Sequence, residues 1–165
     1  MGLKILIIGS GGREHAISWI VSKSKRDIEK IFVMPGNAGT LTEKNVFNIE
    51  CDINDHDAVL SFAIENKIDL TIVGPEVPLV KGISDLFEEN NLNIFGPKKY
   101  FAQLEGSKVF SKNFMDSNNL PTAKYKEFND SNKAKDYLDD KKMPIVIKYD
   151  GLAAGKGVED RKSVV

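Results

Sequence analysis

Short runs of aliphatic and β-branched residues alternate with helical patterns over the first hundred residues of the chain. The runs that predict strands are residues 5–8, 31–34, 46–49, 70–73 and 93–95. The segments that predict helices are residues 13–23, the stretch that Asp55 can cap, and residues 79–89. The apolar positions that share one face of the first helix are Ala16, Ile17, Ile20 and Val21. Strands that alternate with helices in this way are typical of a doubly wound α/β fold with a parallel sheet, which we call Rossmann-like.

The pattern changes after Lys98. Ser107 can cap a helix that ends near Asn119, before Pro121. The elements predicted beyond it are a strand at residues 123–128, a helix at 131–140, an apolar strand at 145–148 and a glycine-rich turn at 150–157. A segment of roughly 40 residues is marginal as an independent domain. The expected parts are a domain of residues 1–101, a connecting helix in 102–121, and the incomplete start of a second domain in 122–165.

Composition narrows the class of protein. Apolar residues make up 41% and charged residues 28%, the balance of a soluble globular chain. With 23 basic and 24 acidic residues, nothing drives the chain toward nucleic acid or an anionic membrane. The single cysteine, Cys51, cannot form an internal disulfide and is expected to be a buried or half-buried small apolar residue. The apolar run at residues 5–8 is too short for an export signal or a membrane span, and Leu6 stands where a myristoylation motif needs Ser or Thr, so we expect a cytoplasmic protein.

A glycine-rich loop, residues 9–15, lies between the first predicted strand and helix. A dinucleotide fingerprint would place its third glycine at Glu14, and its ribose-binding acid is missing from the end of the second strand. NAD binding is therefore disfavoured. The phosphate of a small metabolite fits better, because loop N–H groups, the helix N-terminus and the Arg13 guanidinium can all bind an anion. His15 is either a second donor or a residue that orients the loop.

Two further loops, residues 35–39 and 74–79, follow predicted strands and offer the polar groups of Asn37 and Glu76. Either loop on its own is also compatible with an ordinary turn between a strand and a helix. Because open α/β sheets bind ligands at the carboxyl ends of their strands, three such loops predict a small-molecule pocket. Its candidate residues are Gly9, Ser10, Gly11, Gly12, Arg13, Glu14, His15, Pro35, Gly36, Asn37, Ala38, Gly39, Gly74, Pro75 and Glu76.

A second glycine-rich loop lies at residues 151–157. It differs from a P-loop, because its glycine spacing is one residue short and Gly157 replaces the Ser or Thr that would hold magnesium. A small-residue loop of this kind can still fold over a triphosphate. Lys148 ends an apolar run and is expected to emerge from a buried strand, while Lys108 stands at a helix start, where the helix dipole opposes it. We therefore expect a bound anion near these lysines.

Six segments resemble the phosphoribosylamine–glycine ligase family in order and spacing, over roughly residues 1 to 158. They are residues 7–16, 35–40, 73–76, 95–97, 104–108 and 148–158. Related ATP-grasp enzymes such as biotin carboxylase share the architecture but have different first loops. The resemblance implies a pre-ATP-grasp domain up to about Phe101, a connecting helix, and the beginning of an ATP-grasp lid.

The resemblance also implies chemistry and binding partners. ATP would phosphorylate the glycine carboxylate, and the amine of 5-phosphoribosylamine would displace the phosphate, a reaction of de novo purine biosynthesis. The first three loops would cradle 5-phosphoribosylamine, with Lys108 and Lys148 as candidate catalytic residues beside the ATP phosphates. The residues implied to bind ATP are Gly151, Leu152, Ala153, Ala154, Gly155, Lys156 and Gly157. Mg²⁺ or Mn²⁺ is expected in the complete enzyme, with no metal ligand in this segment.

One departure from the family pattern concerns the end of the chain. Residues 159–162 are charged and are expected to interrupt the strand that follows the second glycine-rich loop. The stretch beyond Val165 would hold the adenine-contacting segment, the metal ligands and the rest of the glycine site. We therefore expect a truncated ligase that is inactive alone. Both a truncated reading frame and one half of a split protein with a separately encoded carboxy-terminal portion would give this pattern. The alternatives are a stand-alone phosphosugar-binding module and, less favoured, an NAD-dependent oxidoreductase.

Overall fold

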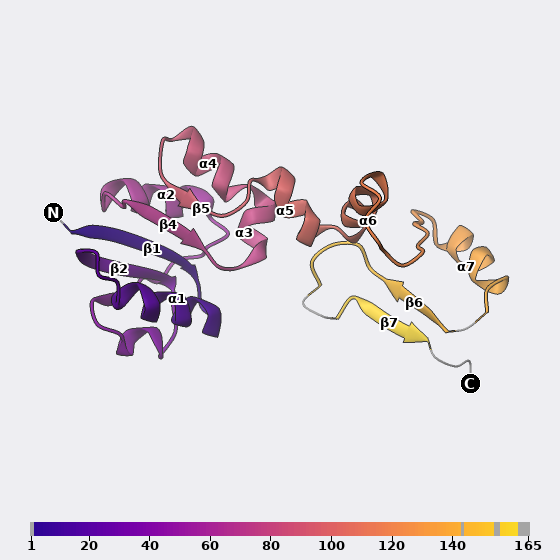
Figure 1. Cartoon of the computed structure of the whole chain (residues 1–165), viewed down its shortest axis with the longest axis horizontal. Helices are drawn as coiled ribbons and strands as arrows, with labels where there is room; N and C mark the ends of the chain where they lie inside the picture. Colours follow the sequence, from indigo (N-terminus) through magenta and orange to yellow (C-terminus); the bar gives the residue numbers. More distant parts are fainter. Residues whose placement is uncertain (1, 143, 154–155, 162–165) are drawn as a thin grey trace. The chain divides into compact units, whose positions relative to one another are not determined.

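The computed structural model describes residues 2–142, 144–153 and 156–161. The chain divides into two compact units, Met1–Ala102 and Gln103–Val165. The first unit contains a five-stranded parallel sheet of order β3-β2-β1-β4-β5 (Figure 1). Its strands are β1 (Leu3–Gly9), β2 (Ile28–Pro35), β3 (Val46–Asn48), β4 (Leu70–Val73) and β5 (Ile94–Phe95). This order confirms the predicted doubly wound fold, and the chain reverses direction across the sheet between β1 and β4.

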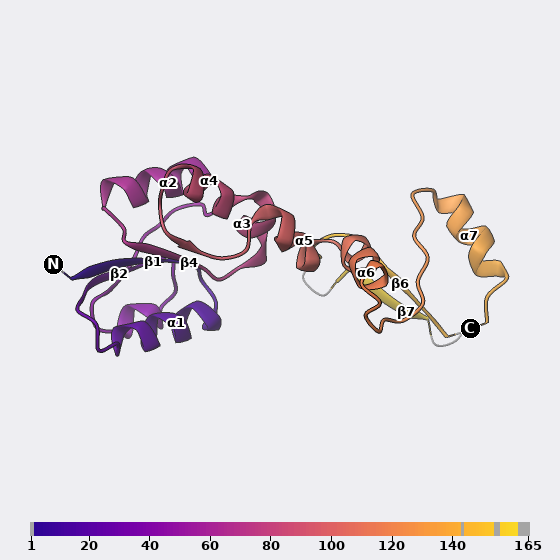
Figure 2. The ribbon, with the colours of Figure 1, turned by 45° about the horizontal axis from the view of Figure 1, so that its top comes forward.

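Helices cover both faces of this sheet. The helical elements up to the end of this unit are α1 (Gly12–Ser22), the 3-10 turn η1 (Thr40–Thr42), α2 (His56–Glu65), α3 (Glu76–Lys81), α4 (Ile83–Glu89) and α5 (Lys99–Gly106), which continues past Ala102 into the second unit. The α1 helix lies on one face, whereas α2, α3 and α4 lie on the other (Figure 2). Asp55 caps α2 as predicted, because its carboxylate accepts the Ala58 N–H at 3.0 Å. No helix in the described part of the chain is long and apolar enough to cross a bilayer.

The core consists of two layers, one on each face of the sheet. Alternate residues of β1 and β2 point to opposite faces, because successive side chains of a strand do so. The strand residues facing α1 are Ile5, Ile7, Ile31 and Val33. Those facing α2 and α4 are Leu6, Ile8, Phe32 and Met34. Residues 5–8 of β1 and 31–34 of β2 are therefore apolar and buried, and Cys51 packs half-buried against the second layer, as expected.

The buried face of α1 differs from the face predicted by apolar spacing. Ala16 is exposed and Ile20 is 57% exposed, whereas Glu14 and Ser18 are buried. The Ser18 hydroxyl donates to the His15 carbonyl at 2.8 Å, which satisfies this polar group inside the core. Polar side chains with local partners thus replace part of the apolar face.

The single helix predicted at residues 79–89 is wrong. The structure has α3 and α4 there, separated by Gly82 with φ of 98° in the left-handed region. Glycine adopts this conformation without steric cost, so it ends one helix and redirects the next. The α3 helix begins at Glu76, three residues earlier than predicted, and accommodates Pro78 in its first turn.

The second unit consists of helices and one two-stranded antiparallel sheet. Its elements are α6 (Lys108–Ser117), α7 (Ser131–Asp139), β6 (Ile145–Lys148) and β7 (Val158–Arg161). Ser107 caps α6 as predicted, since its hydroxyl oxygen accepts the Phe110 N–H at 3.0 Å. The strand predicted at residues 123–128 is wrong. Backbone ladders need a partner strand, and the described part of this unit pairs only β6 with β7.

The strand β6 forms as predicted, but it is not buried. Val146 is 50% and Ile147 is 43% exposed, and Lys148 is exposed as well. Among the residues of the second unit up to Val158 whose burial is described, none is buried, so no core covers this strand there. The predicted emergence of Lys148 from a buried strand is therefore wrong.

The charged residues after Val158 do not interrupt their strand. The β7 strand continues through Arg161, whose backbone pairs with that of Ile145. Charged side chains are compatible with pairing because the ladder uses backbone N–H and carbonyl groups. Lys162 lies outside the described residues.

We predict that Phe87→Ala lowers the free energy of unfolding of the first unit by about 3–5 kcal/mol, because Phe87 is fully buried in α4. Urea unfolding followed by the fluorescence of Trp19, the only tryptophan, measures this unit, because Trp19 lies in α1. Phe95→Ala is the matched control. Phe95 is 72% exposed, so its loss changes the free energy by about 0.5 kcal/mol or less. Equal losses for the two variants contradict the assigned core.

Candidate functional site

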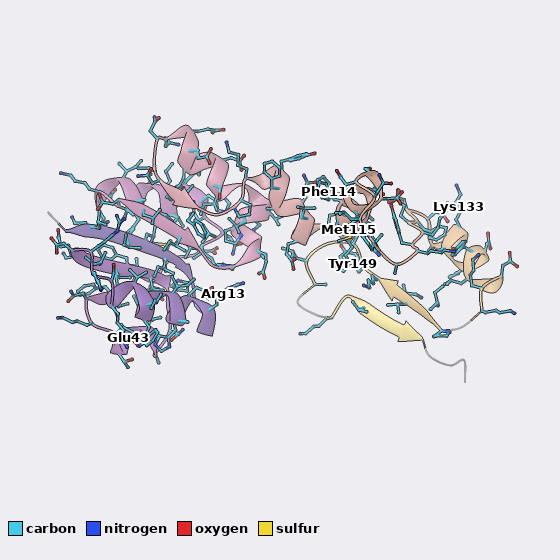
Figure 3. All side chains as sticks on the ribbon, in the orientation of Figure 1. Arg13, Glu43, Phe114, Met115, Lys133 and Tyr149 are labelled. Carbon is cyan, nitrogen blue, oxygen red and sulfur yellow. The ribbon has the colours of Figure 1, made fainter. Side chains whose placement is uncertain are left out.

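Three loops of the first unit meet where β1, β2 and β4 end. The Gly36 N–H donates to the Gly9 carbonyl at 3.2 Å, and the Gly74 N–H donates to the Ile8 carbonyl at 3.0 Å. The loops that follow the three strands are therefore joined by backbone hydrogen bonds, and Arg13 lies at this edge of the sheet (Figure 3). The structure thus brings together the candidate residues of segments 9–15, 35–39 and 74–76.

The Asn37 side chain bridges the first two loops. Its Nδ2 donates to the carbonyls of Ser10 at 2.9 Å and Gly11 at 3.3 Å. Its Oδ1 accepts the N–H groups of Gly39 at 2.7 Å and Thr40 at 3.1 Å. One amide therefore fixes the first loop and closes the turn of its own loop.

Two residues that the sequence interpretation missed support Asn37. The buried Thr40 hydroxyl lies 2.6 Å from Asn48 Oδ1, and Asn48 Nδ2 donates to the Asn37 carbonyl at 2.8 Å. Asn48 is the last residue of β3, so it stands at the same edge of the sheet. A polar residue at the carboxyl end of a short strand was the signal that could have identified it.

His15 has a partner within the protein. Its Nε2 lies 2.9 Å from Glu43 Oε1, and the Glu43 side chain is only 18% exposed. A Cβ on Gly39 would lie 2.6 Å from His15 Nδ1, so the ring packs closely against the second loop. These contacts support the loop-orienting interpretation of His15. Glu43 was not a candidate, because it follows η1 and nothing in its local pattern marks it.

Arg13 is the cationic side chain that reaches solvent at this edge. Its side chain is 57% exposed, and its Nε donates to Glu14 Oε1 at 3.0 Å. Its Nη1 lies 3.9 Å from Oε1 of Glu76, which begins α3 directly after the third loop. A guanidinium held in this way can present a planar pair of donors to an anion.

In the second unit, an internal carboxylate lies at the start of α6. Asp150 accepts hydrogen bonds from the Ser107 hydroxyl at 3.1 Å and the Val109 N–H at 3.1 Å. Lys108 Nζ donates to the Gly151 carbonyl at 2.8 Å, so helix and loop are linked twice. The sequence predicted a bound anion near this helix start, and Asp150 supplies a negative charge there from within the chain. Asp150 was not a candidate site residue, although it directly precedes the glycine-rich loop.

Hydrogen bonds shift the pKa of Asp150. Partial burial raises the pKa, but the Val109 N–H, the Ser107 hydroxyl and the N–H groups of Lys108 and Gly151 donate to the carboxylate and outweigh burial. The pKa therefore lies below its ordinary value of 3.8. Asp150 is ionised at neutral pH.

The glycine-rich loop of the second unit is closed at its base. The Tyr149 N–H donates to the Gly157 carbonyl at 2.8 Å, and the Lys156 N–H donates to the Ala153 carbonyl at 2.8 Å. Lys148, at the end of β6, and Lys156 are both exposed. Ala154 and Gly155, which were predicted to bind ATP, lie outside the described residues. Across the part of the chain that is described, no three His, Cys, Asp or Glu side chains are grouped to hold a metal ion.

Two family models together match residues 3–163. The model described as "Phosphoribosylglycinamide synthetase, N domain" matches residues 3–105, and "Phosphoribosylglycinamide synthetase, ATP-grasp (A) domain" matches residues 106–163. The phosphoribosylamine–glycine ligases of Escherichia coli (strain K12) and Pseudomonas putida are 53% and 54% identical to the chain over 156 residues. Each match covers 94% of this chain and 36% of the relative, so the chain spans about a third of their length.

Solved structures are also similar to this chain. Phosphoribosylamine–glycine ligase from Thermotoga maritima is similar with a TM-score of 0.71 and 31% identity, covering 98% of this chain and 36% of that one. An ADP complex of N5-carboxyaminoimidazole ribonucleotide synthetase has a TM-score of 0.77 at 18% identity, covering 98% and 41%. The biotin carboxylase domain of Hydrogenobacter thermophilus 2-oxoglutarate carboxylase has a TM-score of 0.75 at 18% identity, covering 98% and 38%. At 18% identity the last two show a shared fold.

We predict that the hydrogen bonds of Asp150 stabilise the start of α6 above about pH 4 and are lost in more acidic solution. The folded-state pKa lies below the unfolded value, so this stabilisation is present above the unfolded pKa and disappears as the pH falls through the folded one. Asp150→Asn should make the Val109 amide exchange roughly threefold to tenfold faster at pH 6. Hydrogen exchange followed by NMR measures this rate.

Asp130→Asn is the control for this experiment, because Asp130 caps α7 through the N–H groups of Asn132 and Lys133. It should leave the exchange of Val109 unchanged. An unchanged Val109 rate in Asp150→Asn would contradict the assigned link between the loop and α6.

Proposed function

Because this chain belongs to the phosphoribosylglycinamide synthetase family, we propose that it forms the amino-terminal part of a ligase that joins glycine to 5-phosphoribosylamine with ATP. Family membership confirms the resemblance carried by the six sequence segments. The proposal rests on the convergence of three loops around Arg13, whose exposed guanidinium lies beside the carboxylates of Glu14 and Glu76. The reaction belongs to purine biosynthesis, and the protein's proposed small-molecule partners are 5-phosphoribosylamine, glycine and ATP.

The first unit would bind the phosphate of 5-phosphoribosylamine. A phosphate monoester is a compact dianion, which favours a guanidinium beside backbone N–H groups at a helix start. Arg13 and the first loop provide both within one turn of α1. The Asn37 bridge holds the neighbouring loop in place, so the walls of the site are formed before a ligand arrives.

The second unit would contribute to the ATP site. Lys108, Lys148 and the loop at residues 151–157 carry the cations and N–H groups that phosphates need. A glycine carboxylate oxygen would attack the γ-phosphorus of ATP and release ADP, giving glycyl phosphate. The amine of phosphoribosylamine would then attack the carbonyl carbon, the C–O bond to phosphate would break, and the nitrogen would lose its proton. Both substrates supply the reacting groups, so the protein positions them and neutralises charge.

A divalent cation, Mg²⁺ or Mn²⁺, is expected with ATP in the complete enzyme. The described residues offer no suitable group of ligands, and none of the steps above is assigned to a metal held by this chain. Because the chain spans about a third of its relatives' length, we propose that these 165 residues alone are inactive and that the portion matching the rest of the relatives supplies the remaining groups.

A second candidate function is a stand-alone phosphosugar-binding module. The first unit favours it, because this unit has its own two-layered core and a closed loop cluster, whereas the second unit has no buried residue among those up to Val158 whose burial is described. An NAD-dependent oxidoreductase is disfavoured. The Glu14 side chain fills the space against Gly9 and Gly74 where the fingerprint's third glycine would stand.

We predict that the chain binds ribose 5-phosphate, a stable analogue of phosphoribosylamine, in isothermal titration calorimetry. Arg13→Ala should weaken binding roughly 10-fold to 100-fold, because a charge-assisted pair of hydrogen bonds is lost. Arg26→Ala is the matched control. Arg26 lines a hollow beside Leu3 and Leu70, the residues at which β1 and β4 begin, so it lies at the end of the sheet opposite to the three loops. Absence of binding by the wild-type chain would refute a phosphosugar site.

We predict that glycine-dependent ADP release appears only when the chain is mixed with a separately produced carboxy-terminal portion of a relative. Lys148→Ala should lower that rate roughly 100-fold through lost charge neutralisation. Lys133→Ala, in α7, is the control and should leave it unchanged. ADP release by the chain alone would contradict the proposed inactivity. If both pieces fold and no ADP is released, the ligase proposal fails and the phosphosugar-binding module remains as the candidate function.

A further inference from the structure

Glu14 is a charged side chain buried in the first turn of α1. It is only 3% exposed. Burial of a carboxylate without a hydrogen-bonding or charged partner costs free energy, so Glu14 needs partners inside the protein. Its Oε2 accepts the Gly11 N–H at 2.6 Å, and its Oε1 accepts the Arg13 Nε–H at 3.0 Å. Both carboxylate oxygens are thus engaged by groups of the first loop and its helix.

Glycines from two loops leave the space that Glu14 fills. A Cβ on Gly9 would lie 2.6 Å from Glu14 Cγ, and a Cβ on Gly74 would lie 1.9 Å from Oε1. A Cβ on Gly11 would lie 2.9 Å from Oε2. Gly12 differs, because an added Cβ there would meet nothing within 4 Å. Three of the glycines at this edge therefore make room for a carboxylate of the protein itself.

We infer that Glu14 is a positioning residue of the phosphosugar site and does not itself contact the ligand. It fixes the N–H of Gly11, which is then unavailable to an incoming anion, and it orients Arg13 through Nε. The terminal nitrogens of Arg13 do not contact Glu14, and Nη1 lies 3.9 Å from Glu76 Oε1, so we assign these nitrogens to the ligand. The ligand-facing half of this inference rests on the proposed phosphosugar function.

The packing half is tested without any ligand. Gly74→Ala should lower the unfolding temperature, measured by Trp19 fluorescence, by roughly 5–15 °C, because its methyl group would overlap Glu14. Adding Glu14→Ala to that variant should recover at least half of the loss. Gly12→Ala is the matched control and should shift the temperature by less than about 2 °C. Loss that is not recovered by Glu14→Ala would overturn the assigned packing.

The hydrogen bond to Gly11 has its own spectroscopic signature. A short N–H donation to a carboxylate moves the amide proton resonance downfield, so the Gly11 signal of the ¹⁵N-labelled chain should shift upfield in Glu14→Gln. The Gly39 amide, which donates to Asn37 instead, should stay in place. An unmoved Gly11 signal would overturn the assigned contact.

Ribose 5-phosphate binding separates positioning from direct contact. Glu14→Gln should weaken binding roughly 10-fold in the wild-type background and less than twofold in the Arg13→Ala background, because the effect passes through Arg13. Equal losses in both backgrounds would show that Glu14 acts independently of Arg13 and would overturn the inference. If the wild-type chain binds no ribose 5-phosphate, the proposed function and the ligand-facing half fail together, while the Gly74 and Gly11 results still decide the packing.

Discussion

Burial of β1 on both faces determines where the loops of the first unit lie. Its alternate side chains contribute to both core layers, and its two edges pair with β2 and β4. Because the three strands are parallel and in register, their carboxyl ends coincide, and the loops after Gly9, Pro35 and Val73 meet at the reversal point of the sheet. The position of the candidate phosphosugar site thus follows from the parallel pairing of these three strands around a core on both faces of the sheet.

Both units meet the same requirement at a helix start with an internal carboxylate. The start of a helix leaves N–H groups unsatisfied, which is why such a position suggests a bound anion. Here Glu14 takes the Gly11 N–H before α1, and Asp150 takes the Val109 N–H in α6. An anion proposed to bind at either helix start would find these backbone donors already engaged, so the proposal depends more on side chains such as that of Arg13.

Much of the first unit followed from its sequence. The five strands and the Asp55 cap rest on local signals, and the convergence of the three loops follows from parallel topology. The burial of Glu14 and the Glu43 partner of His15 could not be predicted, because they depend on contacts between segments far apart in the chain. In the second unit, the strand expected at residues 123–128 failed because periodicity cannot tell whether a partner strand is available.

The Asn37 bridge has a thermodynamic consequence for recognition. Each of its side-chain hydrogen bonds ties one loop to itself or to its neighbour, so the conformational entropy of both loops is surrendered during folding. A ligand that enters such loops loses mainly its own translational and rotational freedom. Association should then resemble the docking of two rigid bodies, with a rate set by diffusion and orientation and with little change in the mobility of the backbone around Asn37.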